Sequence, residues 1–305
     1  MPNYTFPDSP PEQLFERIVE QAQAAEACGF SLVTVMDHLY QITGVGPEDH
    51  AMLEAYAALS ALARETKKVR LGTLVTGVTY RNPAFLVKEV TTLDVISGGR
   101  AIFGIGAAWN EDEHIGFGYT FPPVKERMDR LDDALAIAKG MFSGEHFSFT
   151  GRYSEVKDII NSPAPVQPGG PKIMVGGGGE QRTLRIAAKY ADMTHWFPMG
   201  LDTLNHKSEV LRIYCEEIGR DPAEVERTMA APVVPVRTDA ERDTFLERIP
   251  PERRSALTVG SPEQCAEAMK PYIDAGFTGF TFGNTTFRTV ESIQTVGETL
   301  RLLNG

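Results

Sequence analysis

Residues 69–106 read VRLGTLVTGVTYRNPAFLVKEVTTLDVISGGRAIFGIG, and this stretch carries the pattern that decides the fold. Two short apolar runs with β-branched residues, at 69–76 and 101–105, are typical of buried strands. Between them, Asn-Pro at 82–83 is a favourable helix start and Gly-Gly at 98–99 a favourable helix end. The stretch therefore predicts a strand, a helix and a second strand in succession.

The same alternation runs along the rest of the chain. Apolar residues that recur every three or four positions predict helices, and short apolar runs predict strands. The expected strands are 32–36, 69–76, 101–105, 172–175, 193–197, 228–236, 257–259 and 279–282. The expected helices are 11–28, 54–66, 82–97, 124–142, 180–190, 201–218, 239–248, 261–276 and 290–303. Residues 106–123 are expected to be irregular, and the Pro- and Gly-rich residues 144–170 are expected to form an insertion with a hairpin.

Strands that alternate with helices imply a parallel sheet covered by helices. An α/β (β/α)₈ TIM barrel and an open doubly wound sheet both satisfy this pattern, and the regular spacing over 305 residues favours a barrel that forms one domain, 1–305. A first strand should precede the helix at 11–28, but only residues 2–6 are available for it. Either this strand is short or missing, or the sequence starts downstream of the natural first residue.

Composition limits the possible partners and the location of the protein. The 30 basic and 41 acidic residues give a net charge of −11, which argues against binding to nucleic acid or to an anionic membrane. Three isolated cysteines are typical of a reducing compartment. The first residues lack a signal-peptide pattern, and the longest apolar run, 55–63, is too short to span a bilayer. We therefore expect a cytoplasmic protein without membrane or nucleic-acid partners.

In a barrel of this kind the active site lies at the carboxyl ends of the strands. The four glycines 176–179 follow a predicted strand and precede a predicted helix that starts at Glu180. Unobstructed backbone N–H groups beside the positive end of a helix dipole favour a phosphate. The alternative is a tight left-handed turn without a ligand, because no nucleotide-binding fingerprint is present.

Two further strand ends carry candidate residues. Asp37 and His38 follow the strand at 32–36, where His38 could transfer a proton and Asp37 could orient it or contact a cofactor. The alternative is a helix-capping Asp beside a structural imidazole. The small residues Ala107 and Ala108 would let a flat ring approach, while Trp109 either faces this ring or packs in the core.

Metal and covalent chemistry are not expected. The acidic run Glu111–His114 is expected to be a solvated loop, and the histidines show no metal-ligand spacing. No nucleophile elbow is present. A flat phosphorylated cofactor such as a flavin suits the remaining features.

The motifs resemble one known family over nearly the whole chain. The resemblance rests on VMDHL (35–39), LGTLVTGVTYRNPA (71–84), LDVISGGRAIFGIGAAWNEDEH (93–114), VGGGGEQRTLRIAAKYAD (175–192) and GSPEQ (260–264). These blocks resemble the luciferase-like monooxygenase superfamily, and more closely its branch of coenzyme F420-dependent oxidoreductases.

The resemblance implies a (β/α)₈ barrel with the cofactor at the carboxyl ends of the strands. It implies a non-proline cis peptide within residues 73–76, with Thr76 bonded to the polar edge of the cofactor ring, and it implies that residues 144–170 border the substrate pocket. His38 matches a position for proton transfer. The cofactor-binding residues that we expect are Asp37, Thr73, Leu74, Val75, Thr76, Ala107, Trp109, Asn110, Gly176, Gly177, Gly178, Gly179 and Glu180.

By this resemblance the protein transfers a hydride between coenzyme F420 and a small, partly apolar organic substrate. Ala107 stands where sugar-phosphate dehydrogenases of the family carry an acidic residue, which argues against that oxidation. Two alternatives remain, a monooxygenase that uses reduced FMN on the same barrel and a cofactor-binding protein without turnover. A homodimer is possible, since many relatives dimerise.

Overall fold

Seven parallel strands follow one another along a single hydrogen-bonded path, as the alternating sequence predicts. The structure is a computed structural model that describes residues 1–6, 9–254, 256–283 and 287–304. Registers such as Leu32 opposite Arg70 and Met174 opposite Met193 are parallel throughout this path. In spatial order the strands are β1 (Leu32–Val35), β2 (Arg70–Thr73), β4 (Ala101–Gly106), β7 (Lys172–Gly176), β8 (Met193–Trp196), β9 (Glu226–Ala230) and β12 (Gly279–Thr281).

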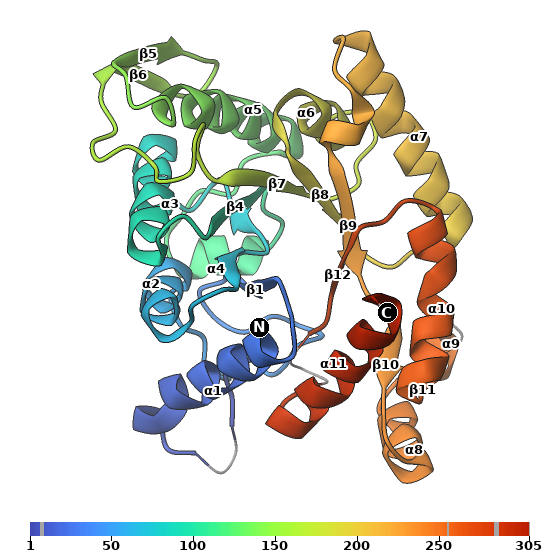
Figure 1. Cartoon of the computed structure of the whole chain (residues 1–305). Helices are drawn as coiled ribbons and strands as arrows, with labels where there is room; N and C mark the ends of the chain where they lie inside the picture. The colour runs from blue at the N-terminus through green and yellow to red at the C-terminus, as the bar shows by residue number, and fades with distance from the viewer. Residues whose placement is uncertain (7–8, 255, 284–286, 305) are drawn as a thin grey trace.

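Helices surround this sheet on its outer side (Figure 1). None of the helices in the described part of the chain is long and apolar enough to cross a membrane. The helices are η1 (Pro11–Gln13), α1 (Leu14–Ala27), α2 (Ala55–Glu65), α3 (Pro83–Ser97), α4 (Glu111–Gly116), α5 (Val124–Met141), α6 (Thr183–Tyr190), α7 (Leu201–Glu217), η2 (Pro222–Glu224), α8 (Asp239–Glu247), α9 (Pro251–Arg254), α10 (Pro262–Asp274) and α11 (Val290–Asn304).

The predicted α/β barrel class, with a short or missing first strand, is confirmed. The path begins at β1, which follows α1, and residues 1–6 form no strand. Within the described residues, β12 and β1 have no strand between them, so the barrel is open along this line. The amino terminus lies inside the ring of helices beside β1 (Figure 1).

The expected strand at 69–76 is divided by a cis peptide bond between Leu74 and Val75. This confirms the cis peptide that the family resemblance implies. After it the chain forms the short strand β3 (Thr76–Gly77), which pairs with the end of β4. The expected single strand is therefore two strands joined by a bulge.

The side chain of Val75 explains the glycines of the neighbouring strands. A Cβ atom added to Gly176 would lie 2.7 Å from Val75 Cγ2, and one added to Gly106 would lie 3.0 Å from the same atom. A Cβ atom on Gly104 would overlap the carbonyl oxygen of Thr73. The glycines of β4 thus make room for the bulge of the protein itself.

Local signals at both ends of α3 are confirmed. The Asn82 side chain accepts hydrogen bonds from the first amides of the helix, and Gly98 ends it with a left-handed φ of 69°. Arg100 then donates to the carbonyl groups of Ala63 and Val69, at 2.7 Å each. These bonds fix the end of α2 and the start of β2 against the start of β4.

Three expected elements differ in the structure. The strand expected at 228–236 is divided into β9 and β10 (Val233–Pro235), and β10 pairs with β11 (Thr258–Gly260) in a separate two-stranded sheet. The helix expected from residue 180 begins at Thr183, and α4 occupies part of the stretch expected to be irregular. Tertiary contacts that a local pattern does not contain decide these boundaries.

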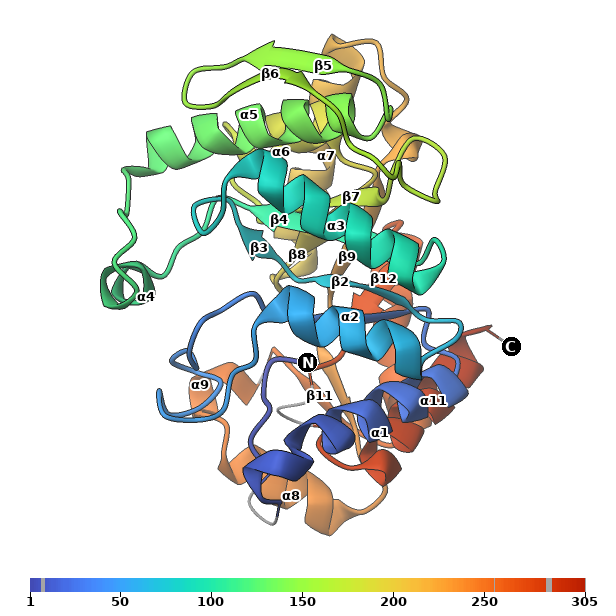
Figure 2. The same cartoon turned by 90° about the vertical axis from the view of Figure 1, so that its left-hand side faces the viewer.

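The insertion at 144–170 contains the predicted hairpin, formed by β5 (Phe147–Thr150) and β6 (Glu155–Ile159). The hairpin packs against α5 on the outer side of the barrel (Figure 2). The carboxylate of Asp133 in α5 accepts the backbone N–H groups of Tyr153 and Ser154 at 2.7 and 3.0 Å. These contacts place the hairpin on the helix layer, and the expectation that residues 144–170 border the substrate pocket stays a prediction.

The fit between the bulge and β4 gives a first prediction. We expect Gly104→Ala to lower the free energy of unfolding by about 1–3 kcal/mol or more, because the added methyl group has to displace the backbone of Thr73. Gly200→Ala is the control, since a Cβ atom there has no neighbour within 4 Å. Denaturant unfolding measures both. Equal stability of the two variants would contradict this account of the bulge.

Candidate active site

Three loops at the carboxyl ends of neighbouring strands form the candidate site. They follow β1, β4 and β7, and they contain all the predicted site residues except the four at the bulge and Gly176, which is the last residue of β7. The bulge lies between these loops, because the N–H of Leu74 donates to Val35 of β1 and Val75 packs against Gly176 of β7. The structure therefore brings the predicted residues to one end of the barrel.

His38 is held by a buried carboxylate that we expected to be solvated. Its Nδ1 atom lies 2.7 Å from Oε2 of Glu113, whose side chain has no exposed surface. The other oxygen of Glu113 accepts the N–H of Leu39, and the hydroxyl of Tyr80 donates to Oε2 at 2.9 Å. Although Glu111 and its neighbour Asp112 are exposed, α4 turns Glu113 inward, and charge composition alone did not reveal this.

The electrostatics of this pair fix the role of each imidazole nitrogen. Burial alone would raise the pKa of Glu113, but hydrogen bonds from His38 and from the N–H of Leu39 lower this pKa below its ordinary value. An ionised carboxylate only accepts hydrogen bonds, so Nδ1 of His38 carries the hydrogen. Nε2 makes no hydrogen bond with any described residue, and it is the nitrogen that remains available for proton exchange.

Trp109 lies at the surface and not in the core. Its side chain is 60% exposed, and its ring stands edge-on to the ring of His38 with the centroids 5.6 Å apart. Asn110 is the N-cap residue of α4, but its side chain makes no capping hydrogen bond. Its backbone carbonyl oxygen lies 2.6 Å from Nδ1 of the buried His114. The amide side chain of Asn110 is thus uncommitted to the cap, whereas His114 is structural.

The turn at 107–108 is held by a residue that the sequence patterns did not indicate. Ala108 has a positive φ of 61°, in the left-handed region. Arg127 of α5 donates to the carbonyl groups of Ala107 and Ala108, and its guanidinium lies 4.2 Å from the centroid of the Phe121 ring. These contacts fix the loop that presents Trp109.

Asp37 and Thr76 are already paired within the protein. Both carboxylate oxygens of Asp37 accept from Arg81, at 2.7 and 3.0 Å, and the side chain is almost fully buried. The hydroxyl of Thr76 lies 2.9 Å from those of Tyr56 and Thr73. These bonds support the loops from within the protein, and the expectation that both side chains contact a cofactor stays a prediction.

The glycine loop after β7 has the features of an anion site. Gly177 has a φ of 108°, a conformation that a side chain rarely adopts, and its N–H donates to the carbonyl of His195. No side chain caps the first turn of α6, which leaves helix N–H groups for another partner. Lys207 of α7 lies beside the loop and donates to the carbonyl of Gly178 at 2.7 Å.

Lys207 adds a positive charge that no pattern in the sequence placed near this loop. It pairs with Glu180 at 3.1 Å, and His206 lies 3.3 Å from the same carboxylate. These hydrogen bonds hold the pKa of Glu180 below its ordinary value. The predicted ligand residue Glu180 thus anchors Lys207, and Lys207 is the side chain with a charge suited to a phosphate.

His195 in β8 is a buried histidine near the glycine loop, with Nδ1 2.9 Å from the Thr228 hydroxyl. Burial lowers the pKa of His195 to about 4. Among the described residues, no group of three His, Cys, Asp or Glu side chains could hold a metal ion. The imidazole is therefore a neutral hydrogen-bonding group within the barrel.

The lowered pKa of His195 predicts an acid sensitivity. Between pH 6.5 and about 4 the unfolded chain binds a proton that the folded chain excludes, so stability is lost as pH falls through this window. We expect His195→Gln to remove up to roughly 3 kcal/mol of this pH dependence. Denaturant unfolding at several pH values tests this, with the exposed His146→Gln as control. An unchanged slope in His195→Gln would contradict the prediction.

The fold is an α/β barrel, and the candidate site lies at the carboxyl ends of its strands. The sequence profile described as luciferase-like monooxygenase matches residues 2–249. The chain therefore belongs to the luciferase-like monooxygenase family.

Two curated relatives are named for coenzyme F420. The chain is 31% identical over 211 residues to an F420-dependent hydroxymycolic acid dehydrogenase from Mycobacterium tuberculosis, a match that covers 68% of this chain and 56% of that enzyme. The chain thus spans little more than half of that relative. It is 29% identical over 299 residues to an F420-dependent glucose-6-phosphate dehydrogenase from Kineococcus radiotolerans, covering 87% of this chain and 86% of that enzyme.

Solved structures show the same fold at lower identity. An F420-dependent secondary alcohol dehydrogenase, solved with an F420–acetone adduct, aligns with a TM-score of 0.80 at 21% identity and covers 95% of each chain. The monooxygenase RslO1 from Streptomyces bottropensis aligns with a TM-score of 0.81 at 18% identity, over 100% of this chain and 98% of that one. The barrel fold is thus shared by dehydrogenases and monooxygenases.

Proposed function

We propose that this protein transfers a hydride between coenzyme F420 and a small, partly apolar organic substrate. The protein is an enzyme of the luciferase-like family, whose F420-dependent members named above support the choice of cofactor. The observation that carries the proposal is the buried Glu113 carboxylate that orients His38 beside the exposed ring of Trp109. A proton-transferring imidazole and an aromatic platform then lie at the same strand ends as an anion site.

The residues present fit a flat cofactor that carries a phosphate. Gly177 and Gly179 supply backbone without side chains, and the uncapped start of α6 and Lys207 supply donors and positive charge for the phosphate. A Cβ atom on Gly179 would lie 2.9 Å from Thr183 Oγ1, so a side chain there would crowd the start of α6. When bound, the deazaflavin of F420 supplies or accepts the hydride.

The protein's own contribution to the reaction is proton transfer and orientation. Glu113 keeps hydrogen on Nδ1 of His38 and stabilises the imidazolium that forms when Nε2 takes a proton from the substrate. In the reverse direction Nε2 returns this proton. Glu113 touches no reacting atom in this scheme, and it is therefore a positioning residue.

The surface near the site favours a substrate with apolar parts. Ile115, Phe117 and Phe197 follow β4 or β8 and are 67%, 53% and 77% exposed. Apolar side chains left exposed next to a polar site often contact an apolar ligand. We assign the partly apolar character of the substrate to these side chains.

The role of Glu113 gives a kinetic prediction. We expect Glu113→Gln to lower kcat about 100-fold with little change in KM, because the imidazolium loses its carboxylate partner. Glu111→Gln on the exposed side of the same helix is the control.

The combination with His38→Gln distinguishes this role from simple destabilisation. If Glu113 acts through His38, the double variant is no slower than His38→Gln alone. Additive losses in the double variant, or a full-rate Glu113→Gln enzyme, would contradict the assignment.

Cofactor titration is the direct test of the proposed function. We expect oxidised F420 to bind more tightly than FMN, as measured by quenching of each cofactor's fluorescence on addition of protein.

Lys207→Met should weaken F420 binding by about 10-fold or more, because a charge-assisted hydrogen bond to the phosphate is lost. Lys270→Met on α10, which removes the ion pair of Lys270 with Glu267, is the control. Preference for FMN, with oxygen consumed in turnover, would instead establish a flavin monooxygenase.

A further inference from the structure

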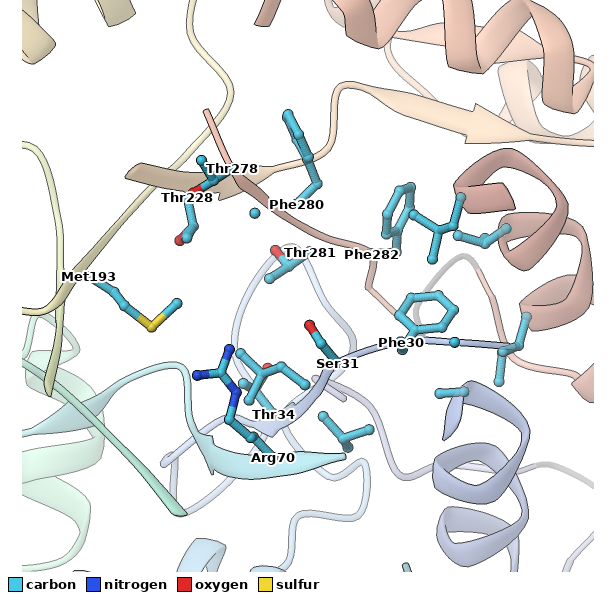
Figure 3. Close-up of a pocket in the computed structure, with 18 of the residues that line it drawn as sticks. Phe30, Ser31, Thr34, Arg70, Met193, Thr228, Thr278, Phe280, Thr281 and Phe282 are labelled. Atoms are coloured by element: carbon cyan, nitrogen blue, oxygen red, sulfur yellow. The ribbon is translucent and has the colours of Figure 1, made fainter. Parts of the chain in front are cut away.

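A cavity of about 620 Å³ lies in the gap between β12 and β1, mainly at the amino ends of the strands (Figure 3). Among the side chains that Figure 3 labels around it, Arg70 is the one that carries a charge. A denser group of charges lies at the other end of β1, where the carboxylate of Asp37 is buried. The proton transfer proposed for His38 does not use this group.

Three carboxylates surround the guanidinium of Arg81. Asp37 accepts from both of its terminal nitrogens, at 2.7 and 3.0 Å. Glu54, the N-cap residue of α2, accepts from one of them at 2.6 Å, and Oε2 of Glu89 in α3 lies 3.0 Å from Nε. Since α2 and α3 pack side by side (Figure 2), these four residues, here called the Arg81 cluster, join the end of β1 to two helices.

The charges of the Arg81 cluster do not balance when every carboxyl group is ionised. Three carboxylates and one guanidinium leave two negative charges without a partner. Glu54 is partly exposed, so water compensates its charge, but the side chains of Asp37 and Glu89 are 1% and 22% exposed. Like charges that are close together and shielded from water disfavour ionisation of one of them. The cluster therefore favours one bound proton.

Glu89 is the carboxyl group with the weakest support for a charge. Asp37 and Glu54 accept aligned hydrogen bonds from Arg81, whereas Oε2 of Glu89 is buried without an aligned donor. The pKa of Glu89 is raised to about 7, mainly by burial, which Arg81 opposes and to which the charges of Glu54 and Asp37 add. Within the described chain these are the charged groups that act on Glu89. Burial also raises the pKa of Asp37, but the paired bonds from Arg81 favour its ionised form.

The neighbouring groups do not titrate near neutral pH. The ring of Tyr56 in α2 lies 5.0 Å from the guanidinium carbon of Arg81, and burial raises the pKa of Tyr56 and of the nearby Tyr4. Lys88, which precedes Glu89 on α3, donates to a carbonyl of the insertion. The strand β4, which also packs against α3, contains no charged residue. A proton that enters or leaves the cluster near neutral pH therefore belongs to its carboxyl groups.

We propose that Glu89 is a positioning residue that makes the candidate site responsive to pH by competing with Asp37 for Arg81. While Glu89 is protonated, Arg81 holds Asp37 with two hydrogen bonds and fixes the chain next to His38. When Glu89 loses the proton, its charge attracts Arg81, and Asp37 is held less firmly. Asp37 is also a predicted cofactor contact, so binding at the site weakens. This last step rests on the proposed function, whereas the exchange of Arg81 between the two carboxylates does not.

The first experiment follows the cluster without a cofactor. Nuclear magnetic resonance of the whole chain, labelled in its carboxyl carbons and arginine nitrogens, is recorded across neutral pH. We expect the carboxyl carbon of Glu89 to titrate with a midpoint near pH 7 and the Nε resonance of Arg81 to move with the same midpoint. In Glu89→Gln the Arg81 resonance should no longer move in this range. A Glu89 carboxyl that is already ionised at acid pH, an Asp37 carboxyl that titrates in its place, or an Arg81 resonance that does not follow Glu89 would overturn the proposal.

The second experiment measures the effect on the site by F420 binding, followed through quenching of the cofactor's fluorescence. We expect the wild-type chain and Glu89→Gln to bind F420 equally at about pH 6, where Glu89 is protonated in the former. At about pH 8.5 the wild-type chain should bind on the order of tenfold more weakly than Glu89→Gln. Comparison at each pH cancels the titration of the ligand and of His38. Glu65→Gln, at an exposed position of α2, is the control and should follow the wild-type chain.

The two experiments separate failure of this proposal from failure of the proposed function. If F420 binds but the ratio between the wild-type chain and Glu89→Gln is the same at both pH values, Glu89 does not position the site. If F420 binds at neither pH, the proposed function is contradicted, and the joint titration of Glu89 and Arg81 still decides whether the two carboxylates compete for Arg81.

Discussion

The packing of Val75 against two glycines of neighbouring strands is the constraint on which the candidate site depends. The side chain points into the space left by Gly106 of β4 and Gly176 of β7, so three neighbouring strands are locked at one level of the barrel. Close packing in an interior tolerates little change in volume, and a methyl group added to either glycine would move the bulge. The loops that follow β1, β4 and β7 start directly above this level. Their relative positions are consequently set by one valine and the absence of Cβ atoms opposite it.

Glu113 then fixes the loops to one another. It belongs to α4, which follows β4, yet its carboxylate binds His38 and the N–H of Leu39, which follow β1. Tyr80, which follows β3, donates to the same group. A single buried charge thus collects donors from three chain segments, and removal of any one donor would leave it less compensated. The contact with Glu113 from which we propose proton transfer by His38 is the same contact that joins the segments.

More of the fold than of the candidate site could be predicted from the sequence. Alternation of short apolar runs and helices predicted the parallel barrel, and the few residues in front of α1 predicted its missing strand, because both signals are local. The role of Glu113 was not predicted, since an acidic run is read as solvated unless the turn of α4 is known. Lys207 reaches the glycine loop from another helix, and Asp37 is paired with Arg81, 44 residues away. Long-range pairing of charges has no periodic pattern, and for this reason composition and spacing could not assign these partners.

The open line of the barrel and the candidate site are related through β1. This strand has β2 on one side and the cavity on the other, so ladder hydrogen bonds hold it from one side within the described chain. An edge strand is held less firmly than a strand paired on both sides. The carboxyl end of β1 carries His38, and it is there that Glu113 supplies bonds to two consecutive residues. The amino half of β1 borders the cavity instead. The two ends of this strand therefore differ in their surroundings, because the bonds to Glu113 lie beyond its carboxyl end and the cavity lies beside its amino end.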